Sequence, residues 1–174
     1  AALLLALGAT HAWAQSYPTK PVRIIVPYAP GGLTDVLTRV LAEPLGQALK
    51  QPFLIDNKPG AGLIIGTELA ARAAPDGYTL LLATDGSISA NPYLYSKLGY
   101  DPQKDFMPVA MLVFANEILM VPPTLPVNTM REFVDYAKAN PGKLNYGSFG
   151  PGSPPHLAMA LLARETGVEL VHVP

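Results

Sequence analysis

The sequence predicts an α/β protein in which helices pack against parallel strands, arranged in two units. Strand and helix signals alternate between residues 22 and 83, and such alternation is typical of a parallel sheet. A strand signal, a Gly-rich turn and a helix signal follow one another again between residues 144 and 166. A Pro-rich stretch at residues 122–126 separates the two patterns and marks a boundary between units. Because 49% of the residues are hydrophobic, the chain can form a sizeable core.

The first unit begins with a strand, a helix and a second strand. Val22–Val26 is rich in β-branched residues, which favour a strand. From Thr34 to Leu49 apolar residues recur at helical spacing, and Pro44 is expected to kink this helix or divide it. Phe53–Asp56 is the second predicted strand.

The remainder of the first unit contains one more helix and one more strand. A Gly-rich turn at Pro59–Gly62 leads to a short helix near Leu63–Ala73 and then to a strand at Tyr78–Ala83. Residues 91–107 mix Pro, Tyr and Asp without a clean period, so they predict an ordered but irregular connection.

The second unit follows two apolar runs, Val109–Phe114 and Ile118–Val121, that lead into the Pro-rich boundary. Thr129-Met130-Arg131-Glu132 has the pattern of a capping box, with Thr at the N-cap of a helix. A short strand is predicted at Leu144–Tyr146, and after the Gly-rich turn Ser153-Pro154 fits an N-cap followed by Pro at the first helical position.

The two ends of the chain carry separate signals. Residues 1–14 read AALLLALGATHAWA, an apolar run that ends in the small-x-small pattern of a signal-peptidase site, so we expect export and cleavage after Ala14. The alternative is a buried N-terminal helix. Val168–Pro174 is a predicted strand that reaches the last residue, and a strand closes a domain poorly. We therefore expect a fragment that starts within its signal peptide and stops inside its second unit.

Composition and motifs argue against several classes of protein. The chain has 12 Lys and Arg against 13 Asp and Glu, for a net charge of −1, and no basic excess that would favour nucleic acid. It has no Cys, and its His residues show no metal-ligand spacing. No G-x-S-x-G elbow and no phosphate-binding P-loop occur. We expect no catalytic residue, no metal and no cofactor.

One Gly-rich segment resembles a nucleotide-binding fingerprint. Gly60–Gly66 follows a predicted strand and opens a helix, and Asp85 lies just past the next strand. The spacing is G-x-G-x-x-x-G, which is one residue longer than the standard pattern. Two hypotheses remain at this point: an exported α/β enzyme that binds a nucleotide cofactor here, or a turn in which Gly supplies backbone freedom.

Two other Gly-rich turns combine exposed amides with hydroxyls at a helix N-terminus. They are Ala29–Asp35 in the first unit and Gly147–Ser153 in the second, and such turns favour anions. Either turn alone is also explained as a capping turn. Two of them, in two units, predict a cleft that binds an anion between the units. Capping is the simpler role for Asp35, and Asp85 could select a ligand that carries an amino group.

Ordered motifs across the whole chain after residue 14 resemble the Bug family, the extracytoplasmic solute receptors of tripartite tricarboxylate transporters. The motifs are Tyr17–Asp35, Asn57–Gly62, Ala74–Leu80, Asn91–Tyr95, Tyr100–Pro102, Lys104–Phe106, Pro141–Tyr146 and His172–Pro174. The resemblance implies a two-lobed, type 2-like periplasmic-binding-protein fold, truncated after the first half of the second lobe. It implies that a small carboxylate binds between the lobes, held largely by main-chain amides and waters.

The resemblance also implies a division of the chain and a set of ligand loops. Residues 15–116 would form lobe 1 and residues 117–174 the hinge and an incomplete lobe 2, with a first hinge strand near Ala115–Val121. The ligand loops map onto residues 28–35, 84–87 and 147–156. The candidate ligand-binding residues are Tyr28, Ala29, Gly31, Gly32, Thr34, Asp35, Thr84, Asp85, Ser87, Ser148, Gly150, Gly152, Ser153 and His156.

The expected partners are the membrane subunits of a tripartite tricarboxylate transporter or a sensor kinase, and the expected location is the periplasm. The chain departs from the family pattern at Leu63 and Ile64, where Gly-Asn is usual. Further departures are the prolines within the first helix and within the second-lobe loop: Pro44, Pro151, Pro154 and Pro155.

Overall fold

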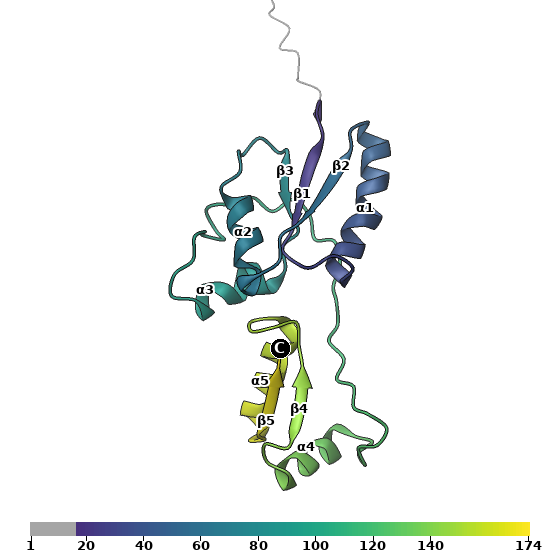
Figure 1. Ribbon diagram of the computed structural model, residues 1–174, viewed down its shortest axis with the longest axis vertical. Helices are drawn as coiled ribbons and strands as arrows, with labels where there is room; N and C mark the ends of the chain where they lie inside the picture. The colour runs from purple at the N-terminus through teal and green to yellow at the C-terminus, as the bar shows by residue number, and fades with distance from the viewer. Residues whose placement is uncertain (1–16) are drawn as a thin grey trace, which may run out of the picture.

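The computed structural model describes residues 17–174, so the predicted signal peptide lies outside the described residues. The first unit is built on a parallel sheet of β1 (Val22–Val26), β2 (Phe53–Asn57) and β3 (Thr79–Leu81), in the order β2-β1-β3 (Figure 1). Val22 pairs with Phe53 of β2, while Arg23 pairs with Thr79 of β3. The predicted parallel sheet is confirmed.

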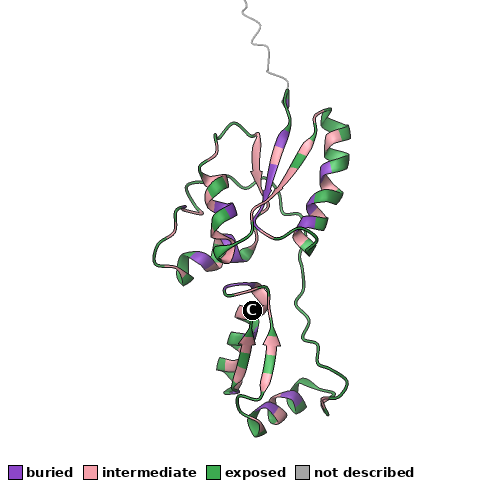
Figure 2. Cartoon of the chain, in the orientation of Figure 1, coloured by how far each residue is buried: buried purple, intermediate pink, exposed green. Residues whose placement is uncertain are grey.

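The central strand β1 forms the core of this unit. Val22, Ile25 and Val26 are fully buried, as Figure 2 shows along this strand. β1 is the central strand, with hydrogen-bonded neighbours on both edges. Four of its five residues are apolar, as expected for a buried strand of a parallel sheet.

Two helices pack beside the sheet. Helix α1 (Leu33–Leu49) contacts β2 and β1, and α2 (Ile64–Ala71) follows a 3-10 turn, η1 (Ala61–Leu63). Of the two outcomes predicted for Pro44, a kink or a division of the first helix, division is wrong, because α1 is assigned as one helix that contains Pro44. Pro44 is exposed, so the carbonyl group that loses its usual amide partner can bond to water.

The connection after β3 is more regular than the sequence predicts. It contains a π-helical turn, η2 (Gly86–Ala90), and a short helix, α3 (Asn91–Leu94), where an irregular stretch was expected from residue 91. Asn91 is almost fully buried and donates to the carbonyl oxygen of Gly62 at 2.8 Å. Tyr100 donates to the carbonyl oxygen of Ser87 at 2.6 Å. These buried bonds, which local sequence patterns do not show, order the segment.

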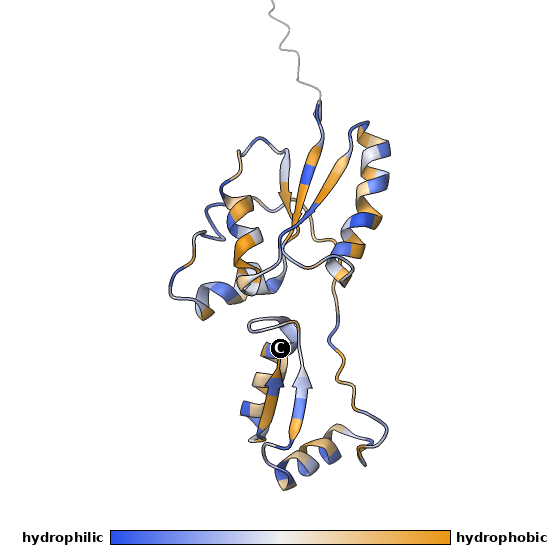
Figure 3. Cartoon of the chain, viewed as in Figure 1, coloured by the Kyte–Doolittle hydropathy of each residue, from blue (hydrophilic) through white to orange (hydrophobic). Residues whose placement is uncertain are grey.

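Residues 107–121 run as an extended segment between the two units. Figure 3 shows several hydrophobic residues along it, and Met107 and Phe114 are each 87% exposed. The expectation of a hinge strand near Ala115–Val121 is wrong, since no strand occurs between β3 and β4 in the described chain. A strand needs a neighbouring strand to accept and donate its ladder hydrogen bonds, and residues 17–174 place none beside this segment.

The second unit consists of α4 (Met130–Ala139), β4 (Leu144–Gly147), α5 (Pro154–Thr166) and β5 (Leu170–Val173). β4 and β5 pair in parallel, with Leu144 opposite Leu170. The Thr half of the predicted capping box forms at the start of α4, where Thr129 Oγ1 accepts from the amide of Glu132 at 3.2 Å. The Glu132 carboxylate accepts from the amide of Asn128, one residue before the N-cap, in place of that of Thr129. No helix in the described part of the chain is long and apolar enough to cross a membrane.

Candidate functional site

A cleft of about 370 Å³ lies where the loops of the first unit face the β4–α5 loop of the second. It is lined by Pro27, Tyr28, Ala29, Pro30, Gly32, Pro59, Gly60, Gly62, Leu63, Phe149, Pro151 and Ser153. Four of the predicted ligand residues are among them: Tyr28, Ala29, Gly32 and Ser153. The other predicted residues lie in the same three segments, in the loops or the first helical turn after them, and several of their polar atoms bond within those segments.

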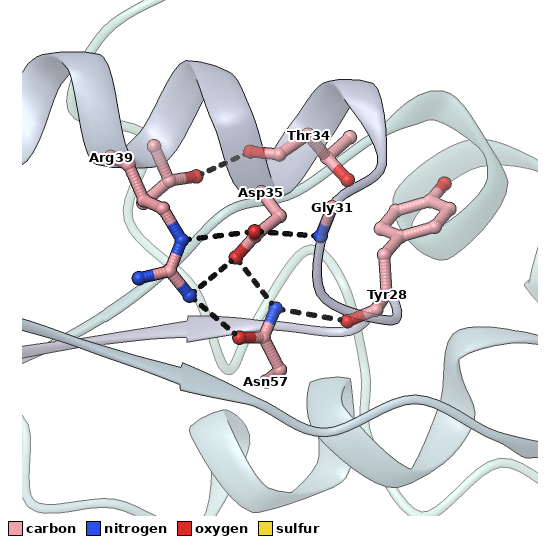
Figure 4. Close-up of polar contacts among 7 residues, drawn as sticks. Tyr28, Gly31, Thr34, Asp35, Arg39 and Asn57 are labelled. Atoms are coloured by element: carbon pink, nitrogen blue, oxygen red, sulfur yellow. Dashed lines mark hydrogen bonds and ion pairs between the residues drawn. The ribbon is translucent and has the colours of Figure 1, made fainter.

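The β1–α1 loop is held by the carboxylate of Asp35 (Figure 4). Gly31, at φ 87°, donates its amide to Asp35 Oδ2 at 2.8 Å. Arg39 donates to both carboxylate oxygens at 3.0 Å. Asn57 donates to Asp35 Oδ1 at 2.9 Å and to the carbonyl oxygen of Tyr28 at 3.1 Å. One buried carboxylate therefore joins the loop, the helix α1 and the end of β2.

These hydrogen bonds decide the role of the Asp35 side chain. The bonds from Arg39, Gly31 and Asn57 hold the pKa of the Asp35 carboxyl well below its ordinary value, so it stays ionised. The residue is only 2% exposed. Its side chain therefore positions the loop, which extends the simple capping role considered from the sequence.

The N-terminus of α1 keeps backbone donors without partners. The first helical hydrogen bond runs from the amide of Val36 to the carbonyl oxygen of Gly32 at 3.0 Å. Gly32, the N-cap, makes no side-chain capping bond. Within the described chain the amides of Leu33, Thr34 and Asp35 have no acceptor, and such amides favour an anion.

The loop after β3 contributes a second polar group. Thr84 Oγ1 lies 2.9 Å from the hydroxyl oxygen of Tyr28. Burial raises the pKa of the Tyr28 phenol, which keeps it protonated and able to donate. The buried Ser87 closes a local turn, because its Oγ donates to the Thr84 carbonyl and accepts from the Thr84 amide. Asp85 is exposed and accepts from the amide of Gly86.

The β4–α5 loop bonds mainly to itself and to β5. Ser148 Oγ lies 2.6 Å from His172 Nε2 and accepts from the amide of Gly150 at 3.0 Å. Ser153 Oγ donates to the Gly150 carbonyl at 2.6 Å. The predicted hydroxyl donors Ser148 and Ser153 are therefore already engaged, Ser148 with His172 of β5 and Ser153 within the loop.

His156 completes this loop as an acceptor. Its Nδ1 accepts from the amide of Gly152 at 3.1 Å. Its ring centroid lies 4.4 Å from that of His172, which also stacks on Tyr146 at 5.0 Å. Burial and the neighbouring His172 lower the pKa of His156 below its ordinary value, so the ring is neutral at pH 7.

Several residues around the site were not predicted. Asn57 and His172 hold the two ligand loops in place, and Leu63, Phe149 and Pro151 line the cleft. Asn57 is the last residue of β2, and ligands of parallel sheets bind beyond the carboxyl ends of strands. That rule could have identified Asn57; no local pattern indicates His172.

The glycines of Gly60–Gly66 have packing roles in this structure. A Cβ atom on Gly66 would lie 2.8 Å from the carbonyl oxygen of Lys58 and 2.9 Å from Cα of Pro27. Gly60 and Gly62 have φ values of 123° and 61°, a region that Gly enters most readily. Both line the cleft described above.

Two α/β units whose Gly-rich turns face one cleft have the arrangement of two-lobed solute-binding proteins. Residues 37–174 match the TctC family, described as the tripartite tricarboxylate transporter family receptor. The chain belongs to this family. A curated relative, a UPF0065 protein of Bordetella pertussis, is 39% identical over 174 residues, which is 100% of this chain and 54% of the relative. The chain thus spans about half the length of the curated relatives that it matches.

Solved structures agree with this assignment. A Rhodopseudomonas palustris protein solved with adipate is 37% identical with a TM-score of 0.85, over 91% of this chain and 53% of that one. The periplasmic binding protein BugD is 36% identical with a TM-score of 0.75, over 91% of this chain and 52% of BugD. The resemblance to the Bug family and the predicted fold class are confirmed.

Proposed function

We propose that the protein is a periplasmic receptor that captures a small carboxylate in the cleft and delivers it to the membrane subunits of a tripartite tricarboxylate-type transporter. The observation that carries the proposal is the N-terminus of α1, where the amides of Leu33, Thr34 and Asp35 have no partner in the described chain. A carboxylate supplies the acceptors that these donors need. The adipate in the related structure supports this choice of ligand.

The mechanism is closure of two lobes around the ligand. We assign residues 15–116 to lobe 1 and residues 117–174 to the hinge and lobe 2, with residues 1–14 as the export signal. Lobe 1 then supplies the carboxylate site, with the Tyr28 hydroxyl and Thr84 Oγ1 beside it. Lobe 2 covers the ligand with the β4–α5 loop, through Ser153 and its neighbours. None of these steps needs a catalytic residue.

A single substitution tests the carboxylate site without disturbing the fold. Gly32 has φ −75° and ψ 170°, and a Cβ atom there would meet only the Ala29 carbonyl oxygen at 3.7 Å. Asp is a good N-cap residue in this conformation. In Gly32→Asp the new carboxylate accepts from the α1 amides itself, so we expect it to abolish ligand binding without lowering thermal stability. Gly32→Ala adds the Cβ atom without the charge and should keep binding.

The protein should be produced from its whole gene, purified from the periplasm and unfolded to release its ligand for mass spectrometry. A stoichiometric carboxylate is the expected result, and calorimetry with that compound then compares the two Gly32 variants. A released nucleotide, or equal affinity for the carboxylate in Gly32→Asp and wild type, would overturn the proposal.

A further inference from the structure

The β4–α5 loop touches the first unit through Gly152 (Figure 1). A Cβ atom on Gly152 would lie 2.9 Å from Leu94 Cδ1 of α3, and a Cβ atom on Gly86 of η2 would lie 3.5 Å from the Gly152 carbonyl oxygen. Gly152 is buried and has φ 80°, a conformation that Gly enters more readily than residues with a Cβ atom. The backbone of the second unit therefore packs directly against η2 and α3 of the first.

His156 fixes the conformation of Gly152. The Nδ1 atom of His156 accepts from the Gly152 amide at 3.1 Å, so this ring nitrogen carries no proton. Protonation of Nδ1 would turn the acceptor into a donor that faces another donor, and the hydrogen bond would break. One protonation step at His156 thus acts on the residue through which the two units touch.

A second imidazole lies against His156. The two ring centroids are 4.4 Å apart, and His172 Nε2 lies 2.6 Å from Ser148 Oγ. Two positive charges so close together repel each other, so the pair takes up its protons one after the other. Burial and His172 lower the pKa of His156, which keeps the ring neutral at pH 7 and lets it become charged in acid.

The other groups around the two rings come from the neighbouring elements. β4 contributes Tyr146, whose ring stacks on His172 with the centroids 5.0 Å apart. Residues 144–163 and 170–174, which include β4, most of α5 and β5, contain no Asp, Glu, Lys or Arg. On the side of the first unit, Asp85 precedes η2 and is exposed. Of these groups, the imidazoles are the ones that ordinarily change charge near neutral pH.

We propose that His156 is a pH-sensitive switch for the closure of the two units. Neutral His156 holds Gly152 in the conformation that packs against η2 and α3, and a proton on Nδ1 releases it. The proposal rests on the proposed function and adds its regulation. Because Phe149, Pro151 and Ser153 of the same loop line the cleft, acid favours the open form and release of the carboxylate.

The pH dependence of binding tests the switch in the protein produced from its whole gene, unfolded and refolded free of ligand. Adipate is titrated by calorimetry at pH 7.5 and pH 5 into the wild type and into His156→Asn, whose side-chain oxygen accepts at any pH. We expect the wild type to lose at least about threefold more affinity than the variant on acidification. The loss should not exceed about thirtyfold, the limit set by an ordinary His pKa of about 6.5. The comparison of the two proteins cancels the titration of adipate itself.

A matched pair of glycines tests the contact between the units. Gly152→Ala places a methyl group against Leu94, whereas Gly142→Ala adds one at φ 67° where no atom of the described chain lies within 4 Å. We expect Gly152→Ala to weaken adipate binding about tenfold and Gly142→Ala to leave it unchanged. Adding Leu94→Ala to Gly152→Ala should restore affinity, because it removes the atom that the new methyl group meets. Equal affinities for the two single Gly variants would overturn the proposal.

Hydrogen exchange of the Gly152 amide, followed by NMR, reports the switch without a ligand. After correction for the intrinsic exchange rate, protection should fall on acidification in the wild type and stay constant in His156→Asn. Equal pH dependence in the two proteins, in protection or in affinity, overturns the switch and leaves the receptor function standing. If neither adipate nor any other carboxylate binds, the proposed function fails, and the amide protection alone decides whether protonation of His156 releases Gly152.

Discussion

The turn after β1 and the turn after β4 occupy the same place in their units, between a parallel strand and a helix N-terminus, yet they offer a ligand different chemistry. In the first, the Asp35 carboxylate holds the loop, and the first three amides of α1 have no acceptor within residues 17–174. In the second, the side chains of Ser148, Ser153 and His156 already form hydrogen bonds with backbone groups of the loop. If the first turn is the carboxylate site that we propose, the comparison teaches that a Gly-rich turn binds an anion only where the surrounding side chains leave its amides open.

Asp35→Asn is expected to have the largest effect on the first turn, on both thermal stability and carboxylate binding. The ionised carboxylate accepts from Gly31, Arg39 and Asn57, and charge-assisted bonds of this kind are the strong ones. The substitution should lower the melting temperature and weaken carboxylate binding by at least about tenfold. Asp135→Asn is the control, because Asp135 is exposed in α4 and lies outside the cleft lining, so both properties should stay unchanged.

The pH dependence of Asp35→Asn follows from the sign of the pKa shift. The pKa of Asp35 is lowered in the folded protein by the bonds from Arg39 and Gly31. Its stabilisation is therefore complete above the unfolded pKa of about 4 and is lost as the pH falls toward the folded value. The difference in melting temperature between wild type and variant should shrink below about pH 4. A constant difference down to acid pH would contradict this role.

Gly66→Ala tests the close packing of Gly66 against the start of the first turn. The new methyl group would press on the Lys58 carbonyl and on Pro27, the residue that leads from β1 into the turn. Overpacking of this kind costs about 1–3 kcal/mol, and urea denaturation should show that loss together with weaker binding. Gly46→Ala in α1 is the control: its Cβ would make an ordinary 3.4 Å contact with Gln51. Ala in a helix interior should there stabilise by up to about 1 kcal/mol.

Leu63→Gly tests how much the backbone conformation of Leu63 costs in stability. Gly removes the penalty of the left-handed conformation at φ 75°, so the free energy of unfolding should rise by about 1 kcal/mol. Leu69→Gly, inside α2, should instead lower it by about 1 kcal/mol. Equal destabilisation by the two substitutions in urea denaturation would mean that Leu63 packing outweighs its backbone strain.

The smallest effect on thermal stability is expected from His156→Asn in the second turn. Nδ1 must stay unprotonated to accept from the amide of Gly152, and burial and His172 lower the pKa of His156 in the folded protein. The stabilisation that the neutral His156 side chain provides is complete above the unfolded pKa of about 6.5 and falls as the pH drops below it. The wild type should therefore lose slightly more thermal stability between about pH 7 and pH 5 than His156→Asn, whose side-chain oxygen accepts at any pH. Parallel pH profiles for the two proteins would contradict this assignment.

Elements governed by local rules were predicted well from the sequence. The β-branched run Val22–Val26 is β1, and Thr129 caps α4 as expected. The departures have tertiary causes, and the buried bonds of Asn91 and Tyr100 that order residues 86–94 are one of them. α1 continues past Pro44 because that face is open to solvent, and Ala115–Val121 is not a strand because no described strand lies beside it.

The sequence by itself determined the α/β alternation, the resemblance to a receptor family and the two Gly-rich turns, because helix, strand and turn preferences act over a few residues. Only the tertiary structure decided which turn keeps its amides open. That outcome depends on Asn57 reaching Asp35 and on His172 reaching Ser148. These partners are far apart in the chain, and only the packed sheets bring them within hydrogen-bonding distance.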